Sequence, residues 1–477
     1  MKLVDVLIGD RALRRRVSRR RFVALAGSSA SLLLLAACGG QATPAKPTEA
    51  PAAKPTEAAK PAEAAKPTEA AKPAEAAKPA DAAKPAQAGP GGFSGGGSLK
   101  LLLQAHFVPA FDQWIDGFAA DWGSKNKVEV TVDHIVSSEL AAKLATEMST
   151  AGGHDIYGLT RAGEMPLYNK QLADVGDVAK QIGLFEGTWK AVPEYFIDFP
   201  GLYRKDLFDA EGLQPVDTWD DLMKVGQLFK GKDHPIGIAI NQKSNDANNT
   251  WTAVLWSFGA TIVDKDGKTV TLNSPATRDA VKYAVELYKT AMTDEVLSWD
   301  DTGNNLMLAS GRAPWIHNPI SAYLTILKQD PELGKNIFIS NTPAGPKGRH
   351  TPVAVNSFGL ANWSSNAAAA KAFLVDYYAV ILDGIKASGG YNQPVVTDLR
   401  KKPMAILGEN PKYQILQDFD QVAHAAGWPG PPSPAAGEVE VNWVIPLMIG
   451  QAIQDGNVDG AVETATKKIE AIYAKYK

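Results

Sequence analysis

Two short stretches of aromatic and charged residues come directly after predicted strands, where they could bind a polar solute. His106 and Phe107 end the first apolar strand pattern, and Arg161 and Glu164 follow the third. The carboxyl ends of strands in a parallel sheet face the ligand crevice of an α/β protein, so these four side chains are candidate ligand contacts. Aromatic faces suit the C–H surfaces of sugars, while guanidinium, amide and carboxylate groups suit their hydroxyls.

A second candidate region is a polar cluster that ends in an aromatic residue. Asn245 and Asp246 begin it, and Asn249 and Trp251 close it. The pattern fits a ligand-binding segment equally well as a solvated loop with a buried anchor, because most tryptophans of an α/β protein lie in the core. Trp428, in a proline-rich stretch, either lines a cleft or covers a sheet edge.

Catalytic and metal-binding patterns mostly fail on inspection. Asp455 and Gly460 fit the start of a calcium loop, but its twelfth position is Thr466 where a bidentate Glu is needed. The seven histidines show no zinc spacing, and there is no phosphate-binding loop of the Walker type. Ser94 forms a formal G-x-S-x-G match that no strand precedes. We therefore expect no cofactor, no metal and no enzymatic activity.

The sole cysteine of the 477 residues, Cys38, follows an apolar run and the small residues Ala36 and Ala37. Small residues fit a tight protease cleft, and a thiol in the next position can be acylated. The stretch resembles the lipobox of bacterial lipoproteins, which predicts lipidation at Cys38. The alternative is an ordinary signal-peptide end with an incidental cysteine.

The segment over residues 1–37 reads as an export signal. It contains Ser18, Arg19 and Arg20 in an arrangement that resembles the twin-arginine signature. The apolar run that follows is too short and too rich in Ala, Gly and Ser to indicate a transmembrane helix. A Sec signal with a basic start is the alternative. The whole chain has a net charge of −3 and this segment one of +6, so the mature part is near −9 and nucleic acid is an unexpected partner.

Residues 38–97 are predicted to be a disordered tether. Lysine–proline pairs recur every six residues from Lys54 to Lys84, within Ala- and Glu-rich sequence. Proline at this interval stops a helix from propagating, and little in the segment can be buried. Fully extended, about 50 such residues would span roughly 150 Å.

From Ser98 onward, strand and helix patterns alternate, which predicts an α/β domain. The expected strands cover residues 99–103, 128–132, 156–159, 236–240, 269–272 and 352–355. Apolar residues from Phe111 to Trp122 repeat with helical spacing. Thr218 and Ser274 are expected to be helix N-caps, Thr218 as part of a capping box and Ser274 ahead of a proline.

Five blocks in this region resemble family 1 of the extracellular solute-binding proteins of ABC importers, the group that includes maltodextrin-binding proteins. The blocks are residues 127–134 with Gly153–Ile156, Leu202–Phe208 (the family's "YNKDLF"), residues 259–287, residues 308–313, and Asp455–Gly456. They cover about 380 residues in an order and spacing that are specific. The family usually has proline where this chain has His154.

The resemblance implies a two-lobed periplasmic-binding-protein fold of type II-like architecture, with a hinge and an interlobe ligand cleft. The N-terminal lobe would comprise residues 98–200 and 355–392, and the C-terminal lobe residues 201–354 and 393–477. Chain crossovers are expected near residues 199–202, 351–355 and 390–395. Closure around the solute would be a hinge motion.

The resemblance also adds candidate ligand contacts. Trp443 stands where maltodextrin-binding relatives carry a sugar-stacking tryptophan. Asn318 and Tyr323 follow the turn near the family's ligand segment, and Tyr391 and Asn392 lie at the third crossover. The alternative is that the glycines beside Tyr391 serve only the turn.

These observations predict a monomeric, lipid-anchored solute receptor on the outer face of the cytoplasmic membrane. It would capture a sugar or oligosaccharide and deliver it to permease subunits and their ATPase. Polyol phosphates and oligopeptides are the next solute classes. The alternatives are an exported enzyme, against which the absent cofactor motifs count, and a sensor subunit that presents a bound ligand to a membrane kinase.

Overall fold

The computed structural model describes residues 93–161, 163–184, 187–395, 410–416 and 418–476. All of them belong to one of two compact units of the chain, and the other unit, residues 10–86, lies outside them. The predicted export signal with Arg19 and Arg20, the predicted lipidation site at Cys38 and most of the predicted tether are therefore outside the described residues. Within the described ranges, no helix is long and apolar enough to cross a membrane.

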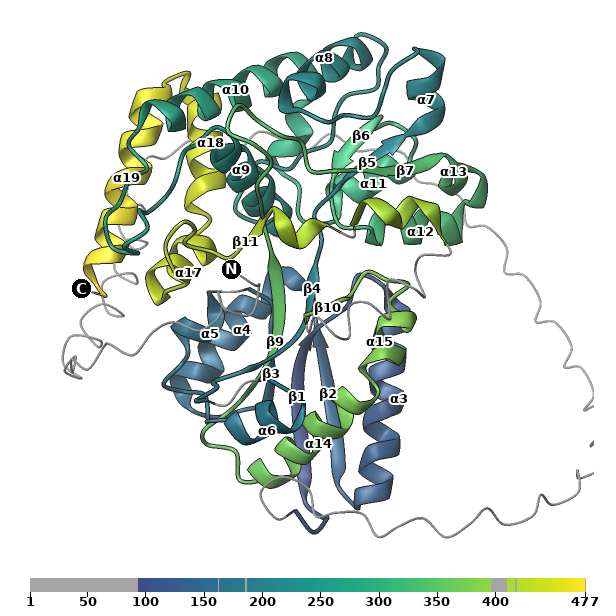
Figure 1. The fold of residues 1–477 in the computed structure, drawn as a ribbon, viewed down its shortest axis with the longest axis vertical. Helices are drawn as coiled ribbons and strands as arrows, with labels where there is room; N and C mark the ends of the chain where they lie inside the picture. Colours follow the sequence, from purple (N-terminus) through teal and green to yellow (C-terminus); the bar gives the residue numbers. More distant parts are fainter. Residues whose placement is uncertain (1–92, 162, 185–186, 396–409, 417, 477) are drawn as a thin grey trace, which may run out of the picture. The chain divides into compact units, whose positions relative to one another are not determined.

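The larger sheet has six strands in the order β10-β4-β9-β3-β1-β2 (Figure 1). The strands are β1 (Ser98–Gln104), β2 (Glu129–Ile135), β3 (Ile156–Leu159), β4 (Val192–Ile197), β9 (Ala354–Leu360) and β10 (Gln393–Pro394). β1 pairs in parallel with β2 and β3, whereas β9 is antiparallel to β3 and β4, and β10 is antiparallel to β4. The sheet is thus mixed, since β9 and β10 enter it only after the chain has passed through a second sheet.

Helices cover both faces of this sheet, and we call the whole group the first lobe. They are α3 (Pro109–Asn126), α4 (Ser137–Thr150), α5 (Glu164–Leu167), α6 (Gly176–Gln181), α14 (Ala367–Ala379) and α15 (Ile381–Ala387). Leu101 of β1 packs in one cluster with Ile115 and Trp122 of α3. Leu102 points to the opposite face and packs with Leu140 of α4. The apolar residues predicted for the strand and for the helix therefore pack against each other, as the sequence predicted.

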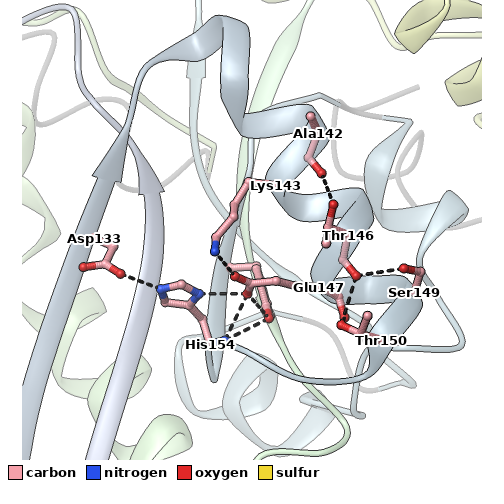
Figure 2. A network of polar contacts seen from close by, with 9 residues as sticks. Asp133, Ala142, Lys143, Thr146, Glu147, Ser149, Thr150 and His154 are labelled. Carbon is pink, nitrogen blue, oxygen red and sulfur yellow. Dashed lines mark hydrogen bonds and ion pairs between the residues drawn. The ribbon is translucent and has the colours of Figure 1, made fainter.

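A polar network joins the end of α4 to the start of β3 (Figure 2). Glu147 accepts hydrogen bonds from His154 Nδ1 at 2.8 Å and Tyr157 O–H at 2.7 Å, and Lys143 Nζ lies 2.9 Å from its other oxygen. His154 Nε2 reaches Asp133 at 2.9 Å. Burial alone would raise the pKa of Glu147, but these hydrogen bonds outweigh it and lower that pKa to about 2. His154 is thus a structural link between α4, β2 and β3.

The second lobe is built around a three-stranded antiparallel sheet of order β6-β5-β7. Its strands are β5 (Gly201–Arg204), β6 (Trp315–His317) and β7 (Ile337–Ser340), with a separate pair of β8 (Thr351–Pro352) and β11 (Ala423–His424). Its helices are α7 (Lys205–Ala210), α8 (Trp219–Lys230), α9 (Asn245–Ser257), α10 (Pro275–Ala291), α11 (Gly303–Ala309), α12 (Ser321–Gln329), α13 (Pro331–Asn336), α17 (Pro434–Val441), α18 (Val444–Asp455) and α19 (Val458–Ala474). Three short 3-10 helices are η1 (Asp294–Leu297), η2 (Pro411–Leu416) and η3 (Phe419–Gln421).

Helix starts in the second lobe follow the predicted capping chemistry. Thr218 and Asp221 form a reciprocal capping box at α8, and the Ser274 side chain accepts from the backbone N–H of Thr277 at α10. The predicted strand over residues 236–240 is wrong. The segment is buried, but its backbone N–H groups donate to Ala291, Trp315 and Val296, so it forms only one isolated bridge. Residues 269–272 likewise form a single bridge, from Val270 to Val263.

The chain passes between the two sheets at positions close to the expected crossovers. β4 leads through residues 198–200 directly into β5, and β8 leads into β9. The expected lobe boundary at residue 392 needs one correction. Gln393 and Pro394 pair with Phe196 and Tyr195 of β4, so β10 belongs to the sheet of the first lobe.

Candidate functional site

A small cavity of about 50 Å³ is lined by residues of both lobes. The first lobe and its connections contribute Gln104, Phe107, Thr160, Arg161, Ile197, Phe199, Ala354, Asn356 and Tyr391. The second contributes Asn245, Asp246, Asn249, Asp301, Asn305, Asn318, Pro319, Ser321 and Glu440. Organic ligands usually occupy about 300–1,000 Å³, so the walls of this cavity must separate before a solute can enter.

Four side chains, which we call the bridging cluster, connect the lobes beside this cavity. They are Ser137 and Arg161 of the first lobe and Asn245 and Asp301 of the second. Arg161 donates through Nε and Nη2 to Asn245 Oδ1 at 3.0 and 2.9 Å. Asn245 Nδ2 donates to Ser137 Oγ at 3.0 Å and to Asp301 Oδ2 at 3.3 Å, and Ser137 Oγ donates to the same Asp301 oxygen at 3.1 Å. These bonds connect the two lobes beside the cavity.

Arg161 is held in place from its other side by an acidic and an aromatic residue. Its Nη1 lies 3.3 Å from Glu164 Oε1, and its guanidinium carbon lies 5.4 Å from the ring centre of Trp443. Glu164 also accepts from the backbone N–H groups of Thr160 and Arg161. Burial raises the pKa of Glu164, and the charge of Arg161 opposes that rise. Glu164 and Trp443 therefore fix where Arg161 points.

Three further carboxyl groups face the cavity from the second lobe. The backbone N–H of Asp246 donates to Asp301 at 3.2 Å, and Asp246 Oδ2 accepts from Asn304 at 3.0 Å. Burial raises the pKa of both aspartates, and for Asp246 the charge of Asp301 adds to the effect. Burial also raises the pKa of Glu440, to about 7, despite the favourable charge of Arg161. The cavity is thus rich in acidic groups.

Five of the residues predicted from the sequence line this cavity: Phe107, Arg161, Asn249, Asn318 and Tyr391. Asn318 is fixed by donating to Asn305 Oδ1 at 2.6 Å. The structure therefore brings together candidates that the sequence offered on separate grounds, namely strand ends, the polar cluster and family resemblance.

Four other predicted residues lie behind the lining. Glu164 and Trp443 contact Arg161, as described above. His106 Nε2 and Asn392 Oδ1 hydrogen-bond at 2.9 Å, and the His106 ring packs edge-on against Tyr391, with centres 5.0 Å apart. Burial lowers the pKa of His106 despite these hydrogen bonds. His106 and Asn392 thus support the position of Tyr391.

The structure corrects three predicted ligand contacts. Trp251 is fully buried in the core of the second lobe, where its Nε1 donates to Ala239 O at 2.9 Å. It lies on the core side of α9, whereas Asn245 and Asn249 face the cavity. Tyr323 is buried in the hydrophobic cluster around α12, which also contains Tyr391, and it is not among the residues that line the cavity. Trp428 stacks on His424, with ring centres 4.2 Å apart, and does not line the cavity.

Sequence reasoning missed Asp301, Glu440 and Asn356 as lining residues. Asp301 stands in an acidic pair before α11, Glu440 alternates with valines in α17, and Asn356 lies within β9. Acidic loop residues and single polar residues in apolar segments are common, so nothing in their spacing marks them. These positions are far apart in the sequence, and only the folded structure brings them to the same cavity.

A close backbone approach joins the lobes on one side of the cavity. A Cβ atom added to Gly437 of α17 would lie 2.4 Å from the carbonyl oxygen of Gly163, just before α5. Only residues without a side chain permit this contact. The glycine pair therefore allows the backbones of the two lobes to meet here.

The comparisons with known proteins agree with this architecture. Residues 104–378, more than half of the chain, match the family described as bacterial extracellular solute-binding protein, and the chain belongs to that family. Members of the family bind solutes and do not transform them, so this protein is not an enzyme. No curated protein sequence matches the chain. Among the described residues, no group of three or more His, Cys, Asp or Glu side chains could hold a metal ion.

Solved structures match almost along their whole length. An ABC transporter solute-binding protein of Thermotoga lettingae bound with α-D-tagatose matches with a TM-score of 0.68 at 17% identity, over 79% of this chain and 99% of that one. Maltose-bound MalE3 of T. maritima matches with a TM-score of 0.68 at 17% identity, over 79% and 100%. A sugar transporter of Arthrobacter chlorophenolicus with bound laminaribiose matches with a TM-score of 0.70 at 14% identity, over 78% and 99%. The protein therefore has the mixed α/β fold of periplasmic binding proteins.

Proposed function

We propose that the protein is the solute receptor of an ABC importer and that its solute is a sugar or an oligosaccharide. The observation that carries this proposal is the interlobe cavity, which combines planar polar groups with the aromatic rings of Phe107, Phe199 and Tyr391. Hydroxyl groups need such donors and acceptors, and the C–H faces of sugars need flat apolar surfaces. The sugars named with the matching structures support the same solute class.

In this proposal, Phe107, Arg161, Asn249, Asn318 and Tyr391 contact the solute directly. Trp443 acts through the position of Arg161. The lobes, residues 98–200 with 354–394 and residues 201–353 with 395–477, turn about the segments that join their sheets. Solute between the lobes favours closure, because it adds contacts that exist only in the closed form.

Export and anchoring complete the proposal. The twin-arginine-like segment would export the folded chain, and a lipid on Cys38 would hold it at the outer face of the cytoplasmic membrane. Residues 38–97 would then tether the receptor near its permease and raise its effective concentration there. The expected partners are permease subunits and their ATPase.

Calorimetric titration of the mature chain with a panel of monosaccharides, disaccharides, polyols and peptides tests the solute class. We expect saturable binding of at least one sugar, with quenching or enhancement of tryptophan fluorescence and no turnover. Binding of a peptide and of no sugar would contradict the proposal. Substitution of Cys38→Ser should release the protein from membranes, and retention of this variant in the membrane fraction would refute the anchor.

A further inference from the structure

The cavity has more acidic than basic groups. Among the described residues that line it, Arg161 is the cation, whereas Asp246, Asp301 and Glu440 are acids. Arg161 is already engaged by Glu164 and by Asn245. These four lining groups therefore carry a net charge of −2 when all three acids are ionised, and the raised pKa values of the acids show that this ionisation is costly without an accompanying positive charge.

The hydrogen bonds to the two aspartates do not compensate this charge. Asp301 accepts from Ser244 Oγ at 2.9 Å and from the backbone N–H of Asp246, in addition to its bonds in the bridging cluster. Asp246 accepts from Asn304 Nδ2. Every one of these donors is neutral. Buried ionised carboxylates are costly unless a positive charge accompanies them.

Two unpartnered acceptor atoms point to what the cavity takes. Asn356 is only 5% exposed and lines the cavity, and its Oδ1 has no hydrogen-bond partner in the described structure. Oε2 of Glu440, which also lines the cavity, is likewise buried and without a partner, although the residue as a whole is half-buried. Both atoms accept hydrogen bonds, so a matching ligand must supply N–H or O–H donors.

We propose that the solute carries a protonated amine as well as hydroxyl groups, as amino sugars and aminocyclitols do. The ammonium lies toward Asp246 and Asp301, which are joined by a hydrogen bond, and hydroxyl groups occupy the unpartnered acceptor atoms of Asn356 and Glu440. This inference rests on the proposed function and narrows its solute class. An ammonium supplies three donors and one positive charge, whereas a neutral sugar supplies donors and leaves the charge of the cavity unbalanced.

A bound metal ion would also supply positive charge, but the geometry does not favour one. No set of three or more acidic, histidine or cysteine side chains in the described ranges lies close enough to hold an ion. A metal ion that needs several carboxylate ligands at one point therefore fits less well than an ammonium group, whose three donors can be shared between a pair of carboxylates and neutral acceptors.

Matched sugar pairs test this proposal on the mature chain by isothermal titration calorimetry at pH 7. The pairs are D-glucosamine with D-glucose, D-galactosamine with D-galactose, and the β-1,4-linked disaccharide of glucosamine with cellobiose. In at least one pair we expect the amine to bind tenfold to a hundredfold more tightly, the gain typical of a hydrogen bond to a charged group. N-acetylation of that amine should abolish the gain, because it removes the charge.

Variants locate the group responsible. Asp246→Asn should reduce the preference for the amine to less than threefold and weaken the neutral partner much less. Asp301→Asn should reduce the preference as well, but it should also weaken the neutral partner, because Asp301 belongs to the bridging cluster. Glu438→Gln is the control, since it removes a carboxylate of the second lobe that contacts Lys475 and Tyr476 and does not line the cavity. The control should keep the full preference.

The outcomes separate this inference from the proposed function. Equal affinity for amine and neutral partners in every pair, with saturable sugar binding, would overturn the inference and leave the sugar receptor standing. Failure of every sugar to bind would overturn both. The wild-type comparison decides the matter even where an aspartate variant does not fold.

Discussion

Glu194 of β4 offers a direct test of how the burial of a carboxyl group changes the stability of this protein with pH. Glu194 is 5% exposed. It lies between Pro193 and Tyr195, where the pairing of β4 with β9 shifts register. Tyr377 of α14 donates its hydroxyl to Oε1 of Glu194. Burial raises the pKa of Glu194 to about 8, and the tyrosine hydrogen bond opposes this only in part.

The size and sign of the effect follow from proton linkage. Because the pKa is higher in the folded state, the folded protein binds this proton more tightly than the unfolded chain does. The free energy of unfolding should therefore fall as pH rises from about 4.5 to about 8. The interval between these values, at 1.36 kcal/mol per pH unit, corresponds to roughly 4–5 kcal/mol.

Glu194→Gln removes the ionisable group while keeping an acceptor for Tyr377. We expect wild type and variant to have similar unfolding free energies at pH 5, and the variant to be more stable by about 3–4 kcal/mol at pH 8. Urea unfolding at pH 5, 6, 7 and 8, followed by circular dichroism, measures the difference at each pH. Groups common to both proteins cancel in that difference.

A control of opposite sign comes from Glu147, whose pKa is lowered to about 2. Its stabilising effect is present above the unfolded pKa and is lost as pH falls toward 2, so Glu147→Gln should cost roughly 1–3 kcal/mol at pH 7 and little at pH 2.5. If the difference between Glu194→Gln and wild type did not change from pH 5 to pH 8, the assigned burial of Glu194 would be refuted.

Three further predictions concern closure and binding. Asn245→Ala breaks the bridging cluster and should weaken solute affinity about tenfold, and unchanged affinity would show that these bonds do not stabilise the closed form. Gly437→Ala places a Cβ 2.4 Å from the carbonyl oxygen of Gly163, so the affinity for the solute should fall at least tenfold. The melting temperature of the variant without solute should stay within a few degrees of wild type. A variant with wild-type affinity would show that this contact is not needed for closure. Trp443→Ala removes the aromatic support of Arg161 and should weaken binding roughly threefold to thirtyfold, whereas Trp428→Ala should not; equal effects of the two would contradict the assignment.

The sequence predicted local structure well where local chemistry decides it. The capping box at Thr218 and the cap at Ser274 satisfy backbone groups within three residues, so no distant contact is required. The helix α3 follows from the spacing of Phe111 and Trp122. The prediction of a strand over residues 236–240 was wrong because an apolar run predicts burial and not strand pairing. A strand also needs a neighbouring strand in register, and the sequence does not show whether the fold provides one.

The candidate site was predictable only in part, for a related reason. Phe107 and Arg161 could be placed because strand ends meet at one edge of a sheet. Asp301 and Glu440 reach the same cavity from a loop and a helix of the other lobe, and no local pattern encodes that meeting. Trp251 shows the converse error, because a helix that turns polar residues toward the cavity turns its aromatic residue toward the core.

Asp301 links the two properties that the site combines. It accepts hydrogen bonds from Ser137 and Asn245 in the bridging cluster, and it lies with Asp246 on the cavity wall. A group that favours its ionised form therefore also strengthens the bonds that connect the lobes. Under the proposed function, a cationic solute would bind the closed form more tightly for this reason, whereas a neutral solute would gain only its own contacts. Recognition of the charge and closure of the lobes are then coupled. Asn245→Ala and Asp301→Asn should therefore have non-additive effects on the affinity for a cationic solute.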